Sequence, residues 1–196
     1  MRGSLKLVTV AGIGLYVHWT FAILIAGLPL LYVSTGSAWP AAVEGLVFIL
    51  AIFLCVVLHE YGHALTARRY GIPTKDITLL PIGGIARLQR IPEEPRQELS
   101  IALAGPAVNV AIAAVLFAIG GAAGRILPPE SIVTAAPGAF ISRLAWINLA
   151  LVAFNMLPAF PMDGGRVLRA FLAMRMDYLR ATEIAAGMGK VMAVAF

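Results

Sequence analysis

Five stretches of this sequence are apolar over about the 20 residues that a helix needs to cross the hydrocarbon core of a bilayer. They lie near residues 17–34, 43–68, 98–120, 138–158 and from about 182 to the end. The composition agrees, because 60% of the residues are hydrophobic and only 13% are charged, against roughly 25% charged in soluble domains. The pattern predicts an integral multi-pass protein of the lipid bilayer, in the cell membrane if the source is prokaryotic.

The basic residues are distributed unevenly between the connections of these spans. With the N-terminus in the cytoplasm, twelve Lys and Arg residues fall on the cytoplasmic side, and Arg125 and Arg143 fall outside. Cytoplasmic loops carry such an excess, so this orientation is expected. Lys190 lies inside the last stretch, where it either snorkels to the surface or lines the interior. Nucleic-acid binding is not indicated, because the basic residues are spread between apolar spans and form no single polar face.

Two segments, 5–17 and 74–90, alternate β-branched and other residues around pairs of glycines. They predict short β-hairpins, with Gly12/Gly14 and Gly83/Gly84 near the turns. The expected fold is therefore an all-α polytopic membrane protein with about five transmembrane helices, six in the intact domain, and two short hairpins. Residues 1–196 form one membrane-embedded domain that we expect to be truncated within its fifth span, because the sequence stops inside an apolar helix.

The chemistry is indicated by the segment VVLHEYGHAL, in which His59 and His63 are four residues apart. This spacing places both imidazoles on one face of a helix, where they can hold one metal ion. Zinc suits imidazole nitrogens with one carboxylate and lowers the pKa of a bound water to about 7. Glu60 lies beside the pair and can take a proton from that water. The motif predicts one Zn²⁺ per chain.

The third protein ligand is expected to be a carboxylate. His18, the one other histidine, lies at the start of the first span and is better explained by packing or hydrogen bonding at the membrane interface. Asp163 follows Pro158 and Pro161 at the end of the fourth stretch, where a broken helix lets it turn into the bundle. The alternative is that Asp163 is an ordinary N-cap for the segment after it.

Together these motifs resemble those of the site-2 proteases, which cut substrate proteins within or beside the membrane. The resemblance is carried by His59-Glu60-x-x-His63 and by Gly105-Pro-Ala-Val-Asn109, followed by the motif from Asn155 through Pro158 and Pro161 to Asp163-Gly164. PIGGIARL and GIGLYVHWTF are similar to the branch whose members often carry C-terminal CBS modules. Such modules are absent from these residues.

The resemblance implies that the second to fourth spans form the catalytic core. The active site is expected toward the cytoplasm, because the segment from His59 to Arg69 lies at the basic side of the second span. It implies His59, His63 and Asp163 as zinc ligands, Glu60 as general base, and a transmembrane protein as substrate. Asn155 would donate to the substrate carbonyl or the oxyanion, or else hydrogen-bond between helices. Asn109 has either a weaker part in substrate binding or a packing role.

Two other functions remain open from the residues alone. Activated water does not itself select proteins, so a membrane zinc hydrolase of a lipid or small molecule is one alternative. A non-catalytic metal transporter or sensor is the other, because intramembrane acids and histidines also mark ion paths. The sequence leaves open whether the chain forms a homo-oligomer.

Overall fold

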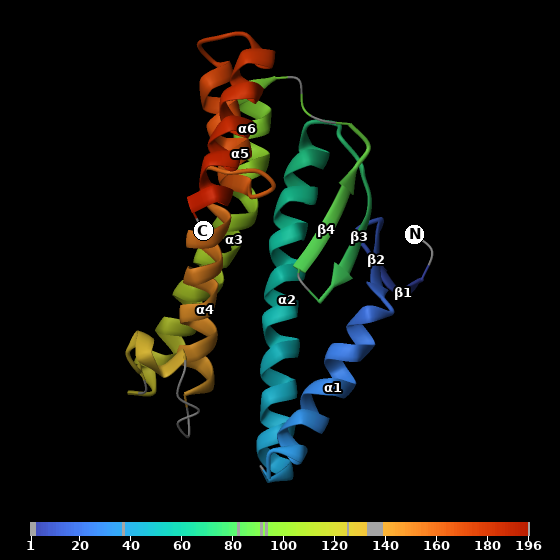
Figure 1. Cartoon of the computed structure of the whole chain (residues 1–196), viewed down its shortest axis with the longest axis vertical. Coiled ribbons are helices and arrows are strands. Elements are labelled where there is room, and N and C mark those ends of the chain that lie inside the picture. The colour runs from blue at the N-terminus through green and yellow to red at the C-terminus, as the bar shows by residue number, and fades with distance from the viewer. Residues whose placement is uncertain are drawn as a thin grey trace.

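The structure, a computed structural model, describes residues 3–36, 38–81, 83–90, 92, 94–124, 126–132 and 139–195. This part of the chain is mostly helical with one small sheet (Figure 1). The elements in chain order are β1 (Ser4–Val10), β2 (Ile13–His18), α1 (Thr20–Ser34), α2 (Trp39–Arg69), β3 (Thr74–Leu80), β4 (Gly83–Leu88), α3 (Pro95–Ala122), the short 3₁₀ helix η1 (Pro129–Ile132), α4 (Phe140–Asn155), α5 (Asp163–Ala173) and α6 (Tyr178–Ala195).

Helix α2 is the central element of the bundle, with α1 and the sheet on one side and α3 and α4 on the other (Figure 1). Its contact with α3 is close because Gly62 has no side chain. A Cβ at Gly62 would lie 2.7 Å from the carbonyl oxygen of Ala104. Small residues allow this backbone approach in membranes, where van der Waals packing and hydrogen bonds join helices.

The expected spans are present as helices, although not all of them are established as membrane-crossing. Among the described helices, α2 and α3 are long and apolar enough to cross a bilayer, while α1 and α4 are apolar but have only 15 and 16 residues. The first span begins later than expected, because residues 17 and 18 belong to strand β2. Helix α6 includes Arg180, Glu183 and Lys190, and Lys190 is exposed.

Both predicted hairpins are confirmed. β1 pairs antiparallel with β2, and β3 with β4. At the first turn Ala11 and Gly12 have φ angles of 52° and 81°, as a two-residue type I′ turn requires. The sequence did not reveal that β2 pairs in parallel with β3, so that the hairpins form one sheet in the order β1-β2-β3-β4.

The sheet packs its apolar face against α2. The shared core includes Ile13 and Ile77 from the sheet and Val57 and Tyr61 from the helix. Strand β4 is an edge strand of this sheet and contacts α2 along the half that carries the histidines. The sheet therefore fixes an extended chain segment beside the predicted site.

The chain breaks after α4 and restarts as a separate short helix. Helix α4 ends at Asn155, and α5 begins at Asp163 after the predicted proline-containing break. Helix α5 packs against α3 and α6. The C-terminal end of α2, the start of α3 and the α5–α6 turn lie at one end of the molecule (Figure 1).

Candidate metal centre

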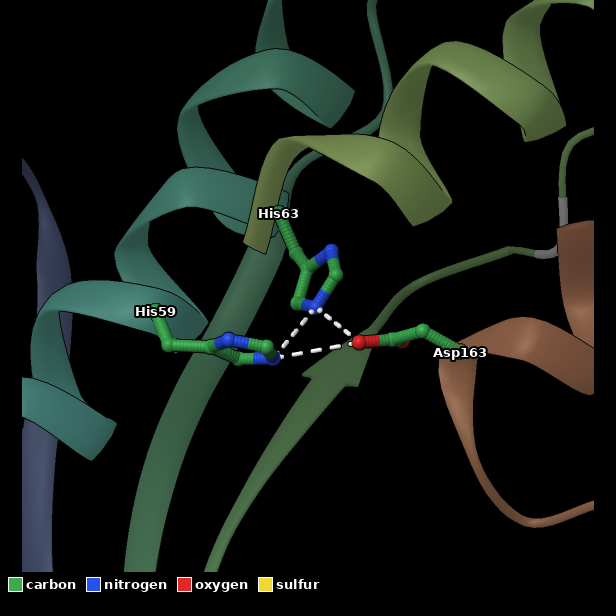
Figure 2. A group of neighbouring side chains, drawn as sticks. All are labelled: His59, His63 and Asp163. Atoms are coloured by element: carbon green, nitrogen blue, oxygen red, sulfur yellow. Dashed lines mark hydrogen bonds and ion pairs between the residues drawn. The ribbon is translucent and has the colours of Figure 1, made fainter. Parts of the chain in front are cut away.

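Three buried side chains from two elements converge at one point in the bundle. His59 and His63 project from α2, and Asp163 projects from the start of α5 toward both rings (Figure 2). The Nε2 atoms of the two histidines lie 3.0 Å apart, and Asp163 Oδ2 lies 3.1 Å from His59 Nε2 and 3.0 Å from His63 Nε2. The structure thus brings together His63 and Asp163, which are 100 residues apart in the sequence.

Hydrogen bonds on the far side of each ring orient the histidines. His63 Nδ1 lies 2.7 Å from the carbonyl oxygen of Ile101, which can only accept a hydrogen bond. The proton of a neutral His63 is therefore on Nδ1, and the lone pair is on Nε2. His59 Nδ1 lies 2.5 Å from Asn109 Oδ1, which leaves its Nε2 free in the same way.

Three lone-pair donors in mutual contact fit a divalent cation. Two imidazoles and one carboxylate are a common ligand set for catalytic zinc, and donors at 2.0–2.1 Å from a tetrahedral ion are about 3.3 Å apart. The triangle formed by His59, His63 and Asp163 has edges of 3.0–3.1 Å. These residues could hold one Zn²⁺ and leave its fourth position to water.

Gly105 on α3 leaves the room that such an ion needs. A Cβ at this position would lie 2.2 Å from His63 Nε2 and 2.6 Å from His59 Nε2. Any side chain larger than hydrogen would therefore occupy the point where the ligand atoms converge. In the sequence Gly105 was only one residue of the motif that ends at Asn109, whereas the structure places it directly against the two imidazoles.

The glycine pair after Asp163 determines how this residue enters the site. A Cβ at Gly164 would lie 2.3 Å from the carbonyl oxygens of Met156 and Leu157, and one at Gly165 would lie 2.7 Å from Phe160 N. The start of α5 can therefore sit directly against the broken segment after α4. Met162 and not Asp163 is the N-cap residue of α5, so the capping alternative for Asp163 is wrong.

Arg166 is a second charged group of α5 at this centre. Its Nη1 lies 3.8 Å from Asp163 Oδ1, the oxygen that faces away from the histidines. Arg166 was not among the predicted site residues, although its spacing of three residues from Asp163 on a helix was a usable signal.

A cavity of ≈ 850 Å³ opens onto the three ligand candidates. Glu60 lines it beside His59 and His63, and a Cβ at Gly84 would lie 2.8 Å from Glu60 Cγ, so strand β4 passes directly over this acid. The wall of the cavity is mostly apolar. A reacting molecule in it would meet the metal site, Glu60 and an extended edge strand together.

The other predicted residues have distinct positions. Asn155 lies at the C-terminal end of α4 and lines the cavity. Asn109 is fully buried, and its amide is engaged by His59 on one side and by Asn148 on the other. His18 lies in β2, where its Nδ1 is 2.7 Å from Thr20 Oγ1, outside the cluster of ligand candidates.

Two buried polar groups were missed by sequence reasoning. Asn148 on α4 and Glu98 on α3 are both fully buried and hydrogen-bonded to other helices. A buried polar residue in an apolar span was the available signal for Asn148. Glu98 is the first residue of the third apolar stretch, and the structure begins α3 three residues earlier, at Pro95.

Comparisons with known proteins point to metal-dependent peptidases, in agreement with the geometry of the centre. The profile of Peptidase family M50 matches residues 47–126 and 120–196. A zinc metalloprotease of Methanocaldococcus jannaschii is 39% identical over 194 residues, which cover 99% of this chain and 53% of that protein. Rip3 of Mycobacterium tuberculosis is 34% identical over 205 residues, covering 99% of this chain and 50% of that protein.

A solved structure shares the fold. The site-2 protease from Methanocaldococcus jannaschii has a TM-score of 0.67 and 36% sequence identity, covering 98% of this chain and 82% of that chain. The chain spans about half the length of the curated relatives described above.

Proposed function

Because this chain belongs to peptidase family M50, we propose that it is an intramembrane zinc metalloendopeptidase that cleaves a peptide bond in or near a transmembrane segment of a substrate protein. The observation that carries the proposal is the triangle of His59 Nε2, His63 Nε2 and Asp163 Oδ2, with edges of 3.0–3.1 Å. Glu60 beside this triangle supplies the acid–base group that peptide hydrolysis needs.

His59, His63 and Asp163 would hold the zinc, which when bound polarises the substrate carbonyl and lowers the pKa of a water. Glu60 accepts a proton from this attacking water and passes it to the leaving amine. Its position next to His59 on the same helix keeps the carboxylate beside the ligands as the proton moves. The apolar walls exclude bulk water and strengthen each charge interaction in the cavity.

Asn155 is the candidate for binding the substrate carbonyl or the developing oxyanion. It ends α4 directly before the broken segment, and it lines the same cavity as Glu60 and Asp163. A fixed amide donor in a dry site stabilises charge that develops during the reaction. Asn109 has its amide engaged on both sides, so we propose that it positions His59 and does not bind substrate.

Strand β4 offers a means of holding an extended substrate. A transmembrane helix hides its peptide bonds in its own hydrogen bonds, so the substrate has to unwind locally before cleavage. β4 is an edge strand, and Gly83, Gly84 and Ile85 line the cavity beside Glu60. An unwound segment that adds to this edge would exchange its helical hydrogen bonds for sheet hydrogen bonds next to the acid.

Length and composition support α2 and α3 as membrane-spanning helices, and the proposed topology adds three more. We propose that α1, α4 and α6 also cross the membrane within one membrane-embedded domain, and that the N-terminus and the metal centre lie toward the cytoplasm. The excess of basic residues at the corresponding connections supports this orientation.

The test combines metal analysis with cleavage of a model transmembrane substrate by the purified protein. We expect Glu60→Gln to retain zinc and lose turnover by about 10²- to 10⁴-fold, whereas Asp163→Ala loses both zinc and turnover. Full activity of either variant would contradict the assignment. If Glu60→Gln traps lipids and no membrane protein, the enzyme is instead a lipid hydrolase.

A further inference from the structure

We infer that Asn148 is a positioning residue that acts through Asn109 to fix the tautomer of His59, so that Nε2 of this ring presents its lone pair to the metal centre. Asn148 lies on α4, and the partners of its side-chain hydrogen bonds are Asn109, Cys55 and Leu144, none of which is a ligand candidate. The inference rests on the proposed metal-binding function and names a further residue on which that site depends.

Three hydrogen bonds connect the backbone carbonyl of Leu144 to Asn148, Asn148 to Asn109, and Asn109 to His59. The Leu144 carbonyl determines which group donates in each of them. Asn148 Nδ2 lies 2.8 Å from this oxygen, which can only accept. The NH₂ end of the Asn148 amide therefore faces Leu144, and the Oδ1 end faces away from it. The amide orientation follows from a backbone group whose hydrogen-bonding role cannot change.

The next two hydrogen bonds carry this direction to the histidine. Asn148 Oδ1 accepts from Asn109 Nδ2 at 2.7 Å, so Asn109 must present its own Oδ1 on the opposite side. This oxygen lies 2.5 Å from His59 Nδ1 and accepts a hydrogen bond from its N–H. In the neutral ring the proton on Nδ1 leaves the lone pair on Nε2, the atom 3.1 Å from Asp163 Oδ2.

Because both asparagines are buried, the orientation of their amides determines the tautomer of His59. Asn109 and Asn148 have no exposed surface, so bulk water cannot replace a hydrogen bond that is lost or reversed. If the Asn109 amide turned over, its NH₂ group would face Nδ1 and stabilise the tautomer with the proton on Nε2. That tautomer cannot bind a metal through Nε2.

The two histidines are thus oriented by different means. His63 donates directly to the backbone carbonyl of Ile101, whereas His59 depends on two side-chain amides between its ring and the carbonyl of Leu144. A change at Asn148 should therefore affect His59 and spare His63. This difference provides an internal reference for the experiment.

The experiment measures zinc affinity by competition with a chelator, and the ring tautomers by ¹⁵N NMR of the histidine-labelled, metal-free protein in detergent. The full chain has three histidines, which keeps the spectrum assignable. Asn148→Leu removes the acceptor for Asn109 Nδ2 and the donor to the Leu144 carbonyl, while the side-chain volume stays similar. Asn148→Asp retains an oxygen acceptor for Asn109, whether it is ionised or neutral. Cys55→Ala is the matched control, because Cys55 Sγ lies 3.4 Å from Asn148 Nδ2 outside the path to His59.

We expect Asn148→Leu to weaken zinc binding by about 10- to 100-fold and to give mixed tautomers of His59 with His63 unchanged. Asn148→Asp should bind zinc more tightly than Asn148→Leu, and Cys55→Ala should bind as the wild type does. A role in apolar packing alone predicts the reverse order, with the leucine variant tolerated and the aspartate variant impaired.

The inference is overturned if Asn148→Leu keeps wild-type zinc affinity and a single Nδ1–H tautomer of His59, or if Asn148→Asp is the weaker binder. Asn148→Ala tests the same step if the leucine variant does not fold. Wild-type protein that binds no zinc would refute the proposed function instead, while the tautomer measurement would still decide the role of Asn148.

Discussion

Arg169 on α5 and Glu98 near the start of α3 form a buried ion pair. Arg169 Nε lies 3.0 Å from Glu98 Oε1, and the guanidinium Nη2 contacts the same oxygen. The other carboxylate oxygen accepts a hydrogen bond from the Tyr178 hydroxyl of α6 at 3.3 Å. A single acid therefore joins α3, α5 and α6, and α5 is the helix that carries Asp163.

Removing the cation of this pair should destabilise the domain. Arg169→Met leaves the fully buried Glu98 carboxylate without its partner, and such a change costs about 3–5 kcal/mol. We expect a lower free energy of unfolding in detergent and a lower zinc content, because α5 is less firmly held against α3. Arg180→Met, at an exposed arginine of α6, is the control and should behave as the wild type.

The double variant Glu98→Leu/Arg169→Met separates the ion pair from its desolvation cost. It removes both charges, so most of the lost stability should return. A single Arg169→Met variant as stable as the wild type would show that Glu98 has another way to be stabilised.

Gly105→Ala should abolish metal binding while leaving the helices folded. Its Cβ would lie 2.2 Å from His63 Nε2, where the ligand atoms converge. The measurement is zinc per chain by elemental analysis, with helix content followed by circular dichroism. Gly27→Ala on α1 is the matched control, because a Cβ there meets nothing within 4 Å. Full zinc occupancy of Gly105→Ala would mean that the metal is not held between these rings.

Asn155→Leu should slow turnover without loss of metal. The side chain lines the cavity, whereas the ligand candidates are His59, His63 and Asp163. Loss of an amide that stabilises the oxyanion costs about 10²- to 10³-fold in kcat. Steady-state cleavage and zinc analysis of the same sample check this expectation. Unchanged kcat would assign Asn155 to helix packing.

Proline substitutions at Ile85 and Ala86 test substrate pairing with β4. Successive N–H groups of a strand point to opposite sides, so one substitution removes a donor to β3 and the other a donor at the free edge. The variant that loses the donor at the free edge should keep its stability and its zinc, and it should lose cleavage of a transmembrane substrate. Proline at Thr78 would be a poorer test, because β3 is paired on both sides. Normal cleavage by both stable variants would contradict edge pairing.

Local sequence patterns predicted most of the helices, both hairpins and part of the metal centre. Apolar stretches predicted helices, and the glycine pairs predicted hairpins, because hydropathy and turn preferences act over neighbouring residues. The spacing of His59 and His63 predicted one ligand face, since residues four apart lie together on any α-helix. Asp163 was selected by its acid chemistry and by the prolines before it.

Tertiary structure decided what depends on side chains from different helices meeting. The parallel pairing of β2 with β3 and the position of Gly105 between the rings have no local signature. The hydrogen-bond path from Leu144 to His59 joins Asn148 to Asn109, 39 positions apart, and Asn109 to His59, 50 positions apart. Sequence spacing fixes which groups share a helix face, but only packing of the helices fixes the few ångströms between groups that a metal ligand or a hydrogen bond requires.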